Sequence, residues 1–373
     1  MPYLNPGDII FIALLLVTAI LLFYYLWFFA RLAFYKDRNS ANGAGQPVSI
    51  IVCGKNEASN FAKNVPALLQ QQSGTAYQVL IVNDQSTDDT ASILAALKSD
   101  HPTLTVLNLS QNPTGMPGKK YPLSAGINNA ANELLLLTDA DCVPASEHWL
   151  ERMTNPYRNG AEVVLGYGAY QKYPGFLNKV IRYETFHSAL QYLSYALAGI
   201  PYMGVGRNLS YKKDLFFKNN GFADISHLPG GDDDLFINKV VTSKNTAVVI
   251  APEAHTISAP KRTWAEWKTQ KTRHFSTSKY YKSNHKVLLG LYSLSHFLFY
   301  IFIITTGFAY HWREALLVLV LKSLIQQVIF GRVMKKLNEP DLCKWALAMD
   351  LWMVVYYLLF APMLFKKEKK SWN

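Results

Sequence analysis

A long uncharged, apolar run near the start constrains this chain more than any other feature. Residues 9–30 contain no charged side chain, and as a helix rising 1.5 Å per residue they would be about 33 Å long, enough to cross the hydrocarbon core of a bilayer. Basic residues follow from Arg31 onward. A cleaved signal peptide is the alternative, but such a peptide has a basic start and ends in small residues, whereas this start carries Asp8 and the run ends WFFARLAFY. The run therefore predicts an uncleaved membrane anchor at residues 1–31, with the following residues in the cytoplasm by the positive-inside rule.

The C-terminal region 287–365 is apolar again and predicts two or three further membrane segments, at 287–309, 315–330 and 345–365. The middle one contains Lys322, and a lysine at the centre of a membrane helix costs about 3 kcal/mol on insertion scales. Three crossings would place the basic tail 366–373 outside, and two would keep it inside. The middle segment is therefore a candidate for an interfacial or re-entrant helix, and the sequence leaves this open.

The composition agrees with a membrane protein. Charged residues make up 17% of the chain, against about 25% in soluble domains, and the formal net charge is +11. A basic, aromatic-rich chain fits anionic lipid or an anionic substrate. Nucleic acid is the rival partner, but the sequence shows no helix-turn-helix, RNP or zinc pattern, so no nucleic-acid binding is expected. The three cysteines form no CxxC pair and indicate a reducing compartment.

The middle of the chain has a different character. After a polar linker at 32–46, apolar strand-like runs alternate with helical stretches through residues 47–260. The runs are VSIIVCG, QVLIVND, LTVLNL, LLLLTDA and, as a fifth strand, AEVVLGYGAY at 161–170. This alternation predicts an α/β domain whose mostly parallel, Rossmann-like sheet is covered on both faces. In such sheets ligands bind beyond the carboxyl ends of the strands.

Carboxylate and amide side chains follow three of these strands. KNEAS follows the first, Asp84 ends the second, and Asp139 and Asp141 end the fourth. Two carboxylates this close after four leucines are costly unless a cation joins them. Mg²⁺ takes carboxylate and phosphate oxygens, so Asp139 and Asp141 are candidate metal ligands. An Asp-x-Asp pair alone is a weak signal, and its place after a strand strengthens it.

With these motifs in order, the chain resembles the family 2 glycosyltransferases, inverting nucleotide-sugar enzymes with the GT-A fold, over about residues 47–281. The opening strand and Asn-Glu match SIIVCGKNEAS, and the DDGSxDxT element is similar to NDQSTDDT, with Asn83 and Gln85 as departures. The element GKxxAlNxG resembles GKKYPLSAGINNA, the DxD is Asp139 to Asp141, and GxGxNxxYxxxxF resembles GVGRNLSYKKDLF. The EDxDL and QxxRW elements resemble GDDDL and QKTRH, with Gly231 for Glu and His274 for Trp.

The resemblance implies roles for individual residues on the donor side. Asp141 would ligate Mg²⁺ or Mn²⁺, and Asp139 would ligate the metal and touch the ribose. The nucleotide sugar would further meet Asn56, Glu57, Asp84, Lys119, Gln270 and Arg273. A carboxylate beside uracil can accept its N–H, which favours a UDP sugar. The alternatives are that Glu57 and Lys119 are solvated loop residues.

On the acceptor side, the resemblance makes Asp232 the general base and Asp233 the runner-up, because the Asp triplet can be aligned one position off. Asp234 is the candidate helix cap of the three. His255 is a weaker candidate for a third metal ligand, since a lone histidine is usually structural.

Residues 261–286 combine seven Lys or Arg up to Lys282 with interleaved aromatic residues. Such a stretch is typical of an interfacial helix. Gln270 and Arg273 share one helix face, which could close over a diphosphate, with Arg273 pairing to phosphate oxygens. His274 stands where polymer-making family members have a tryptophan that stacks on acceptor sugar, which favours transfer of a single sugar.

The sequence therefore predicts a membrane-bound inverting glycosyltransferase. It would move a sugar from a nucleoside diphosphate sugar to a lipid or glycan acceptor at a bacterial inner membrane, for envelope glycan or glycolipid synthesis. The alternative is a non-catalytic relative that binds nucleotide sugar, suggested by the departures at Asn83, Gly231 and His274. The sugar, the acceptor and the oligomeric state are not readable from the sequence.

Overall fold

The computed structural model describes residues 5–37, 45–308 and 311–365. The predicted basic tail 366–373 and the centre of the predicted linker, 38–44, lie outside them. A seven-stranded sheet forms the centre of the fold, and it is parallel except for β8, which runs antiparallel to both neighbours. The strand order is β3 (Leu104–Leu109), β2 (Tyr77–Asp84), β1 (Val48–Gly54), β4 (Leu134–Asp139), β8 (Leu209–Lys212), β6 (Val163–Leu165) and β9 (Thr246–Val248). The predicted α/β class with a mostly parallel sheet is confirmed.

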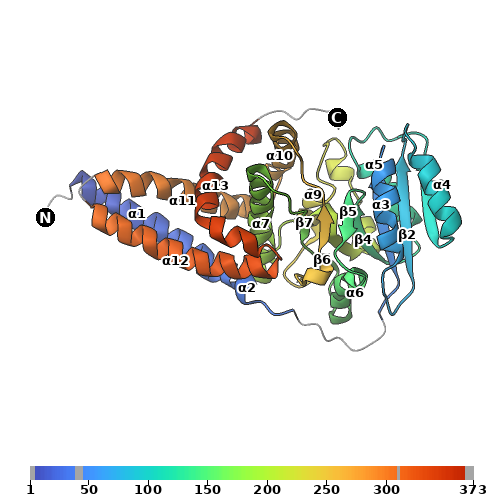
Figure 1. The fold of residues 1–373 in the computed structure, drawn as a ribbon, viewed down its shortest axis with the longest axis horizontal. Coiled ribbons are helices and arrows are strands. Elements are labelled where there is room, and N and C mark those ends of the chain that lie inside the picture. The colour runs from blue at the N-terminus through green and yellow to red at the C-terminus, as the bar shows by residue number, and fades with distance from the viewer. Residues whose placement is uncertain (1–4, 38–44, 309–310, 366–373) are drawn as a thin grey trace.

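Helices cover both faces of this sheet (Figure 1). On one face Ile50 of β1 shares a core with α3 (Ala58–Leu69), α4 (Thr90–Asp100) and α6 (Trp149–Thr154). On the other face Ile51 shares a core with α5 (Lys120–Asn129) and α7 (Phe176–Leu197). Gly126 lets α5 approach closely, because a Cβ there would lie 2.9 Å from Cγ2 of Ile51.

A second, three-stranded sheet has the order β5 (Cys142–Pro144), β10 (Thr256–Ser258) and β7 (Gly168–Tyr170). The prediction of one strand over 161–170 is wrong, because the chain splits there into β6 and β7, which belong to different sheets. The split occurs at Gly166, where any larger residue would collide with Asn208, since a Cβ there would lie only 2.5 Å from Nδ2. Asn208 instead donates hydrogen bonds to the carbonyls of Tyr167 and Ala254, which joins the two sheets.

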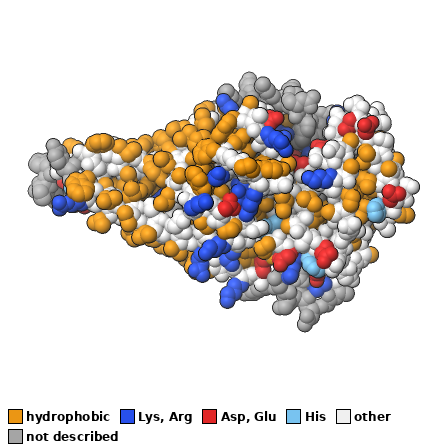
Figure 2. All heavy atoms as spheres, in the orientation of Figure 1, with side chains coloured by type: hydrophobic (Ala, Val, Ile, Leu, Met, Phe, Trp, Pro, Cys, Tyr) orange, Lys and Arg blue, Asp and Glu red, His pale blue; other side chains and the backbone are white. Residues whose placement is uncertain are grey.

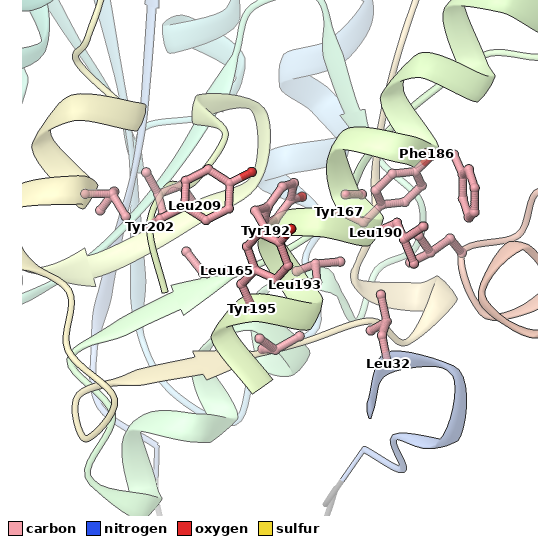
Figure 3. Packing of buried hydrophobic residues seen from close by; sticks show 14 of the residues in the cluster. Leu32, Leu165, Tyr167, Phe186, Leu190, Tyr192, Leu193, Tyr195, Tyr202 and Leu209 are labelled. Carbon is pink, nitrogen blue, oxygen red and sulfur yellow. The ribbon is translucent and has the colours of Figure 1, made fainter. Parts of the chain in front are cut away.

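Helix α7 fills the space between the sheet and the helices at the chain ends, and the sequence pattern did not predict it. Its aromatic side chains lie in the core (Figure 3). The Tyr192 hydroxyl donates to the Gly166 carbonyl at 2.7 Å, and the Tyr195 ring stacks on Phe29 of the N-terminal helix at 6.4 Å. The α/β domain and the membrane-type helices therefore share one continuous core.

The N-terminal anchor is one continuous helix made of α1 (Pro6–Phe23), a π-helical segment η1 (Tyr24–Phe29) and α2 (Ala30–Phe34). It lies beside α11 (Ser283–Phe308) and α12 (Trp312–Lys336) in a bundle that extends away from the α/β domain (Figure 1). Figure 2 shows that hydrophobic side chains dominate the visible surface of this bundle. By length and composition, four helical segments could cross a membrane: 6–34, α11, α12 and Pro340–Met363.

The middle C-terminal segment, for which an interfacial position was considered, packs lengthwise against its neighbours as α12. Its Lys322 is buried and pairs with Asp350 of α13 (Ala346–Phe360) at 2.5 Å. Gln326, one turn further along α12, donates to the other Asp350 oxygen at 2.7 Å. A partnered lysine costs far less in an apolar bundle than an unpaired one, so Lys322 does not exclude α12 from the membrane.

The remaining elements are short apart from α10, which occupies most of the predicted interfacial stretch; the first turn of α11 covers its end. They are η2 (Asn155–Asn159), η3 (Gly206–Asn208), α8 (Lys213–Lys218), η4 (Ala223–Ile225), α9 (Asp234–Val240), η5 (Pro252–Ala254), α10 (Trp264–Ser278), η6 (Pro340–Trp345) and η7 (Ala361–Phe365).

Replacing Glu339 by glutamine is expected to destabilise the junction between the α/β domain and the C-terminal apolar helices. Arg182 of α7 pairs with Glu339, and both side chains are at most 3% exposed. Removing the carboxylate leaves a buried guanidinium with only the more exposed Asp341 as a partner, a loss of about 3 kcal/mol by analogy with other broken buried pairs. We expect a melting temperature several degrees lower in detergent. Lys218→Gln breaks the exposed pair with Asp214 and is the control; an equal shift in both variants would contradict this account.

Candidate active site

The carboxyl ends of β2, β1 and β4 meet at one edge of the main sheet. In the strand register Cys53 is the partner of Asp139, and Gly54 is the partner of Asn83. Asp84 follows Asn83 and ends β2. The sheet topology therefore brings the polar residues after these strands to the same edge, as the sequence predicts for a ligand site.

The loops after β1 and β2 are tied to each other. The Asn56 backbone N–H donates to Ser86 Oγ at 2.9 Å, and its side-chain oxygen accepts from the Thr87 N–H at 2.8 Å. Asn56 has a φ of +56°, a left-handed conformation that asparagine tolerates better than most residues. The carboxamide oxygen of Asn56 is thus engaged in shaping the loop.

Glu57 lies near the acidic cluster. Its carboxylate accepts from Asn60 Nδ2 at 2.5 Å. Burial raises the pKa of Glu57, and the nearby Asp141 raises it further. Glu57 is half-buried, and its backbone N–H donates to Thr90 Oγ1 at 2.9 Å, which holds it beside the loop after β2.

Lys119 directly precedes α5 and reaches the end of β4. Its Nζ lies 2.6 Å from Oδ1 of Asp139. Burial alone would raise the pKa of Asp139, but Lys119 outweighs it and lowers the pKa. Conversely, burial alone would lower the pKa of Lys119, and Asp139 raises it well above its usual range. At neutral pH this is an ion pair of full charges, so Lys119 is positioned rather than loosely solvated.

The neighbouring Lys120 points the other way. It is buried, and its Nζ donates to the Leu228 carbonyl. This contact ties the start of α5, and with it Lys119, to the loop that leads into the Asp triplet.

Asp139 and Asp141 form the oxygen-rich part of a candidate cation site. Ligand atoms of Asp139, Asp141 and Cys142 all lie within 4.8 Å of one another. Burial and then Asp139 raise the pKa of Asp141, as expected for two close carboxylates. Two of the three candidate ligands are therefore carboxylates, and the third is a thiol. Hard divalent cations such as Mg²⁺ and Mn²⁺ prefer carboxylate oxygens, so these residues fit one.

The three consecutive aspartates have three different environments. Asp233 precedes α9, and its two oxygens accept from the backbone N–H groups of Gly206 and Asp234 at 2.8 and 2.7 Å. Burial and then Asp232 raise the pKa of Asp233 to about 8. Asp234 is buried and accepts from the hydroxyls of Thr277 and Tyr281 at 2.5 and 2.8 Å. The prediction that Asp234 is the cap is wrong, because Asp233 caps α9. Asp234 instead joins α9 to the end of α10 and to the residues directly after it.

Asp232 and Asp233 both face the site, but only Asp233 has its oxygens engaged by backbone N–H groups among the described residues. Asp232 lines a small cavity of about 20 Å³ together with Lys119, Asp139 and Asp233. Within residues 5–37, 45–308 and 311–365, no hydrogen bond or ion pair engages its carboxylate. Burial raises the pKa of the Cys53 thiol, and Asp232, Asp139 and Asp84 raise it further. Cys53 lines the same cavity as Asp139 and Asp232, two acids from separate stretches of the chain.

Helix α10 carries Gln270, whose Nε2 donates to the Tyr170 hydroxyl at 3.2 Å. Arg273 is exposed and close enough to lower the pKa of Asp139. His274, also exposed, follows it. Phe275, on the side of α10 away from Arg273, and Trp267, one turn before Gln270, both pack on Phe360 beyond the α/β domain.

Arg207 is a site residue that the sequence reasoning missed. Its guanidinium lies over the Tyr170 ring at 4.2 Å and donates to Ser258 Oγ at 3.0 Å. Burial alone would lower the pKa of Arg207. Tyr170 and Cys142, followed by Asp141 and Asp139, raise it above its usual range. Its place inside the quoted GVGRNLSY motif was the available signal, since a half-buried arginine in a motif near a ligand site needs an anionic partner.

His255 and Gly231 have structural roles. His255 Nε2 bonds with the Ile250 carbonyl at 3.1 Å, and its ring packs on Tyr167. Burial lowers the pKa of His255 to about 4, so it is a neutral core histidine. Gly231 has a φ of +96°, and a Cβ there would lie 2.7 Å from Leu235, which explains glycine at that position.

A family model described as "Glycosyl transferase family 2" matches residues 49–217. Among curated proteins, the chain is 36% identical over 121 residues to a beta-monoglucosyldiacylglycerol synthase of Nostoc sp. (strain PCC 7120 / SAG 25.82 / UTEX 2576), covering 32% of this chain and 25% of the relative. It is 25% identical over 172 residues to a 4,4'-diaponeurosporenoate glycosyltransferase of Staphylococcus haemolyticus (strain JCSC1435), covering 46% and 41%. These matches span about a quarter to two fifths of the relatives' length.

Among solved structures, the chain resembles the mannosyltransferase PcManGT from Pyrobaculum calidifontis, determined in complex with GDP-Man and Mn²⁺. The TM-score is 0.56 at 18% identity, and the match covers 93% of this chain and 99% of that one. At this identity the likeness concerns the fold, which agrees with the predicted GT-A architecture and with the helices at both ends of the chain.

Proposed function

We propose that the family 2 glycosyltransferase domain formed by residues 49–217, together with the Asp triplet and α10, transfers a sugar from a nucleoside diphosphate sugar to an acceptor hydroxyl. One observation carries the proposal: Lys119, Asp139 and Asp232 line a single cavity at the carboxyl end of the sheet. This arrangement supplies a cation for phosphate, a carboxylate for a metal ion and a carboxylate for proton transfer, which together are what a sugar transfer needs.

Asp232 is proposed as the general base. The acceptor oxygen attacks the anomeric carbon while Asp232 takes the hydroxyl proton, and the bond from that carbon to the diphosphate oxygen breaks with its electrons leaving on the diphosphate. A single displacement of this kind inverts the anomeric configuration. Asp233 suits this task less well, because both of its oxygens already accept backbone hydrogen bonds.

The departing diphosphate is proposed to be met by positive charge on three sides, from Lys119, Arg207 and Arg273. Asp139 and Asp141 would hold Mg²⁺ or Mn²⁺, which supplies Lewis-acid stabilisation of the leaving group. Arginine suits phosphate because its planar fork can donate two hydrogen bonds. Gln270, fixed on Tyr170, would position the donor beside them.

The donor base is proposed to be uracil. Asp84 and Glu57 are proposed to meet the nucleoside, and a carboxylate can accept the uracil N3–H. Guanine offers N–H donors to a carboxylate as well, and the mannosyltransferase of similar fold was determined with GDP-Man. UDP and GDP sugars are therefore the two donors to compare directly.

A lipid acceptor is proposed from the position of α10. Gln270 and Arg273 of this helix are proposed to face the donor, while Trp267 and Phe275 pack against the apolar Phe360. A hydroxyl carried by a membrane lipid would reach the site along this helix. The names of the relatives, a glucosyldiacylglycerol synthase and a diaponeurosporenoate glycosyltransferase, agree with a lipid acceptor in envelope glycolipid synthesis.

The domain is proposed to face the cytoplasm from a bacterial inner membrane. Basic residues gather where the bundle meets the domain, as Figure 2 shows on the face in view. They include Arg31, Arg332, Lys335 and Lys336. Positive residues of this kind mark the cytoplasmic side of a bacterial membrane.

The proposal is tested by incubating purified protein and lipid extract with UDP and GDP sugars plus Mg²⁺ or Mn²⁺, and by following products by mass spectrometry. We expect one UDP sugar to give a glycolipid that carries a single added sugar. If only a GDP sugar served as donor, the choice of uracil would be wrong, but the proposed sugar transfer would stand. Binding of nucleotide with neither transfer nor hydrolysis for any donor would favour the non-catalytic alternative.

Replacing Arg207 by glutamine is expected to lower turnover by about 10²-fold, the usual loss on removing one preorganised donor from a developing negative charge. Arg207→Lys is expected to recover only part, because lysine lacks the bidentate fork. Turnover and inhibition by the nucleoside diphosphate product are the readouts. Arg158→Gln, in a 3₁₀ turn outside the site, is the control; wild-type turnover in Arg207→Gln would remove Arg207 from the site.

A further inference from the structure

Both ends of the last apolar helix rest on the α/β domain side of the molecule. At its start, Arg182 of α7 donates to Glu339 Oε2 from Nε at 2.9 Å and to Asp341 Oδ2 from Nη1 at 2.8 Å. At its end, the Phe360 ring stacks on Phe275 of α10 at 5.4 Å, and it meets Trp267 edge-on at 5.5 Å. A helix that crossed the membrane would have one end remote from that domain.

The direction and length of α13 agree with this. The anchor helix, α11 and α12 run side by side away from the α/β domain, whereas α13 runs across them (Figure 1). The regular helix Ala346–Phe360 has 15 residues and is about 22 Å long, shorter than the hydrocarbon core of about 30 Å. The segment Pro340–Met363 reaches a spanning length only when the flanking 3₁₀ turns are included. The helices α11 and α12 have 26 and 25 residues and are about 38 Å long.

The two faces of α13 differ in what they contact. The inner face carries Asp350, which is fully buried against Lys322 and Gln326. The outer face is a stripe of large apolar residues between 41% and 57% exposed: Leu347, Leu351, Val355, Leu358 and Leu359. This stripe follows helical spacing, and it would be unfavourable in water.

The rim of this stripe is amphipathic. The ring of Trp352 contacts Phe176 and Trp264 at 6.0 and 5.8 Å, and both of these are exposed. Lys179 and Arg262 lie nearby, over the rings of Trp345 and Tyr173. Aromatic residues with adjacent cations are typical of the boundary between hydrocarbon and headgroups. The stripe also continues the exposed apolar surfaces of α11 and α12, which points to lipid as its partner.

The two ends of the three-helix bundle have different charges. At the remote end Asp8 and His311 lie 3.4 Å apart. At the end near the α/β domain, Arg332 lies over the Phe34 ring, and Lys336 donates to the Tyr35 carbonyl. About 29 Å of helix separates positions 313 and 332 of α12, which matches one hydrocarbon thickness.

We propose that the chain crosses the membrane three times, through the helix 6–34, α11 and α12, and that α13 lies embedded in the leaflet beside the α/β domain without crossing. The outer face of α13 contacts lipid acyl chains. The chain after Phe365 then emerges on the same side as the α/β domain. Among the C-terminal segments, α13 therefore stays within one leaflet, whereas α12, which carries Lys322, crosses the membrane.

Labelling with a membrane-impermeant maleimide in sealed vesicles of known orientation tests the topology. The background is Cys343→Ala, in which the remaining Cys53 and Cys142 are buried and serve as the unlabelled blank. Single cysteines replace Lys98 in the α/β domain, Arg313 at the start of α12, and Asn373. We expect Lys98→Cys and Asn373→Cys to be labelled in the same vesicle orientation and Arg313→Cys in the opposite one. Labelling of Asn373→Cys together with Arg313→Cys would overturn the proposal.

A spin label on Val355→Cys in the same background tests the lipid contact. Leu317→Cys on the exposed face of α12 is the lipid control, and Lys218→Cys is the water control. We expect oxygen to relax the Val355 label more than a water-soluble nickel complex does, as at Leu317. Access of the nickel complex to the Val355 label as at Lys218 would overturn the proposed lipid contact. So would an immobilised label that neither reagent reaches, because a second copy of the chain would then cover this face.

Discussion

Asp232→Asn is expected to lower turnover by about 10²–10⁴-fold, the contribution of a general base, while the affinity for the nucleoside diphosphate stays close to wild type. The carboxamide keeps the shape of the side chain but cannot take the acceptor proton at neutral pH. Asp232 is not held by hydrogen bonds within the described residues, so the exchange should not disturb the fold. Product formation and calorimetric binding of the nucleotide are the two measurements.

Asp224→Asn is the matched control for this variant, because Asp224 lies eight positions before Asp232, is exposed and, among the described residues, pairs only with Lys239 at the surface. We expect it to retain wild-type turnover. If Asp232→Asn turned over at the wild-type rate, another group would have to accept the proton, and Asp233 would be the next to test. A loss of nucleotide affinity equal to the loss of turnover would instead give Asp232 a binding role.

Asp141→Ala is expected to abolish metal-dependent turnover, with a loss of at least about 10³-fold, because a Lewis acid at the leaving group is worth several kcal/mol. The variant removes one of the two carboxylates whose mutual repulsion raises the Asp141 pKa. Chelation of the metal in the wild type should cause a loss of similar size, and added Mn²⁺ should restore only the wild type.

Asp89→Asn is the control for Asp141→Ala, because Asp89 is an exposed acid beside α4 and belongs to the same run of aspartates as Asp84. Its turnover and its response to Mn²⁺ should match the wild type. Full recovery of Asp141→Ala at higher Mn²⁺ concentration would reduce Asp141 to a minor ligand. Turnover that is indifferent to chelation in the wild type would remove the metal from the account.

The sheet and its site edge were predictable because they depend on local patterns. Continuous runs of Val, Ile and Leu encode the strands, and the polar residues that end β2 and β4 meet wherever parallel strands are neighbours. Asp84 and Asp139 could therefore be assigned to one edge from their order in the chain, whereas Lys119 was assigned to the site only through the family resemblance. The short strands were harder to predict, since the break between β6 and β7 depends on Asn208, some 40 residues away.

The different environments of Asp232, Asp233 and Asp234 could not be predicted, because they depend on contacts from distant segments. Gly206 engages Asp233, and Thr277 and Tyr281 engage Asp234. Likewise, the role of Asn56 in joining two loops depends on Thr87. The partner of Lys322 lies on another helix, so the sequence pattern shows a charge in an apolar segment without its counter-charge.

Binding of Mn²⁺ measured by electron paramagnetic resonance, with and without a nucleoside diphosphate, tests the central claim most directly. The claim is that Asp139 and Asp141 hold one divalent cation against the diphosphate of the donor. We predict that the nucleotide promotes Mn²⁺ binding to the wild type, and that this promotion is lost in a variant carrying both Asp139→Asn and Asp141→Ala. Undiminished, nucleotide-promoted Mn²⁺ binding in that folded double variant would contradict the account.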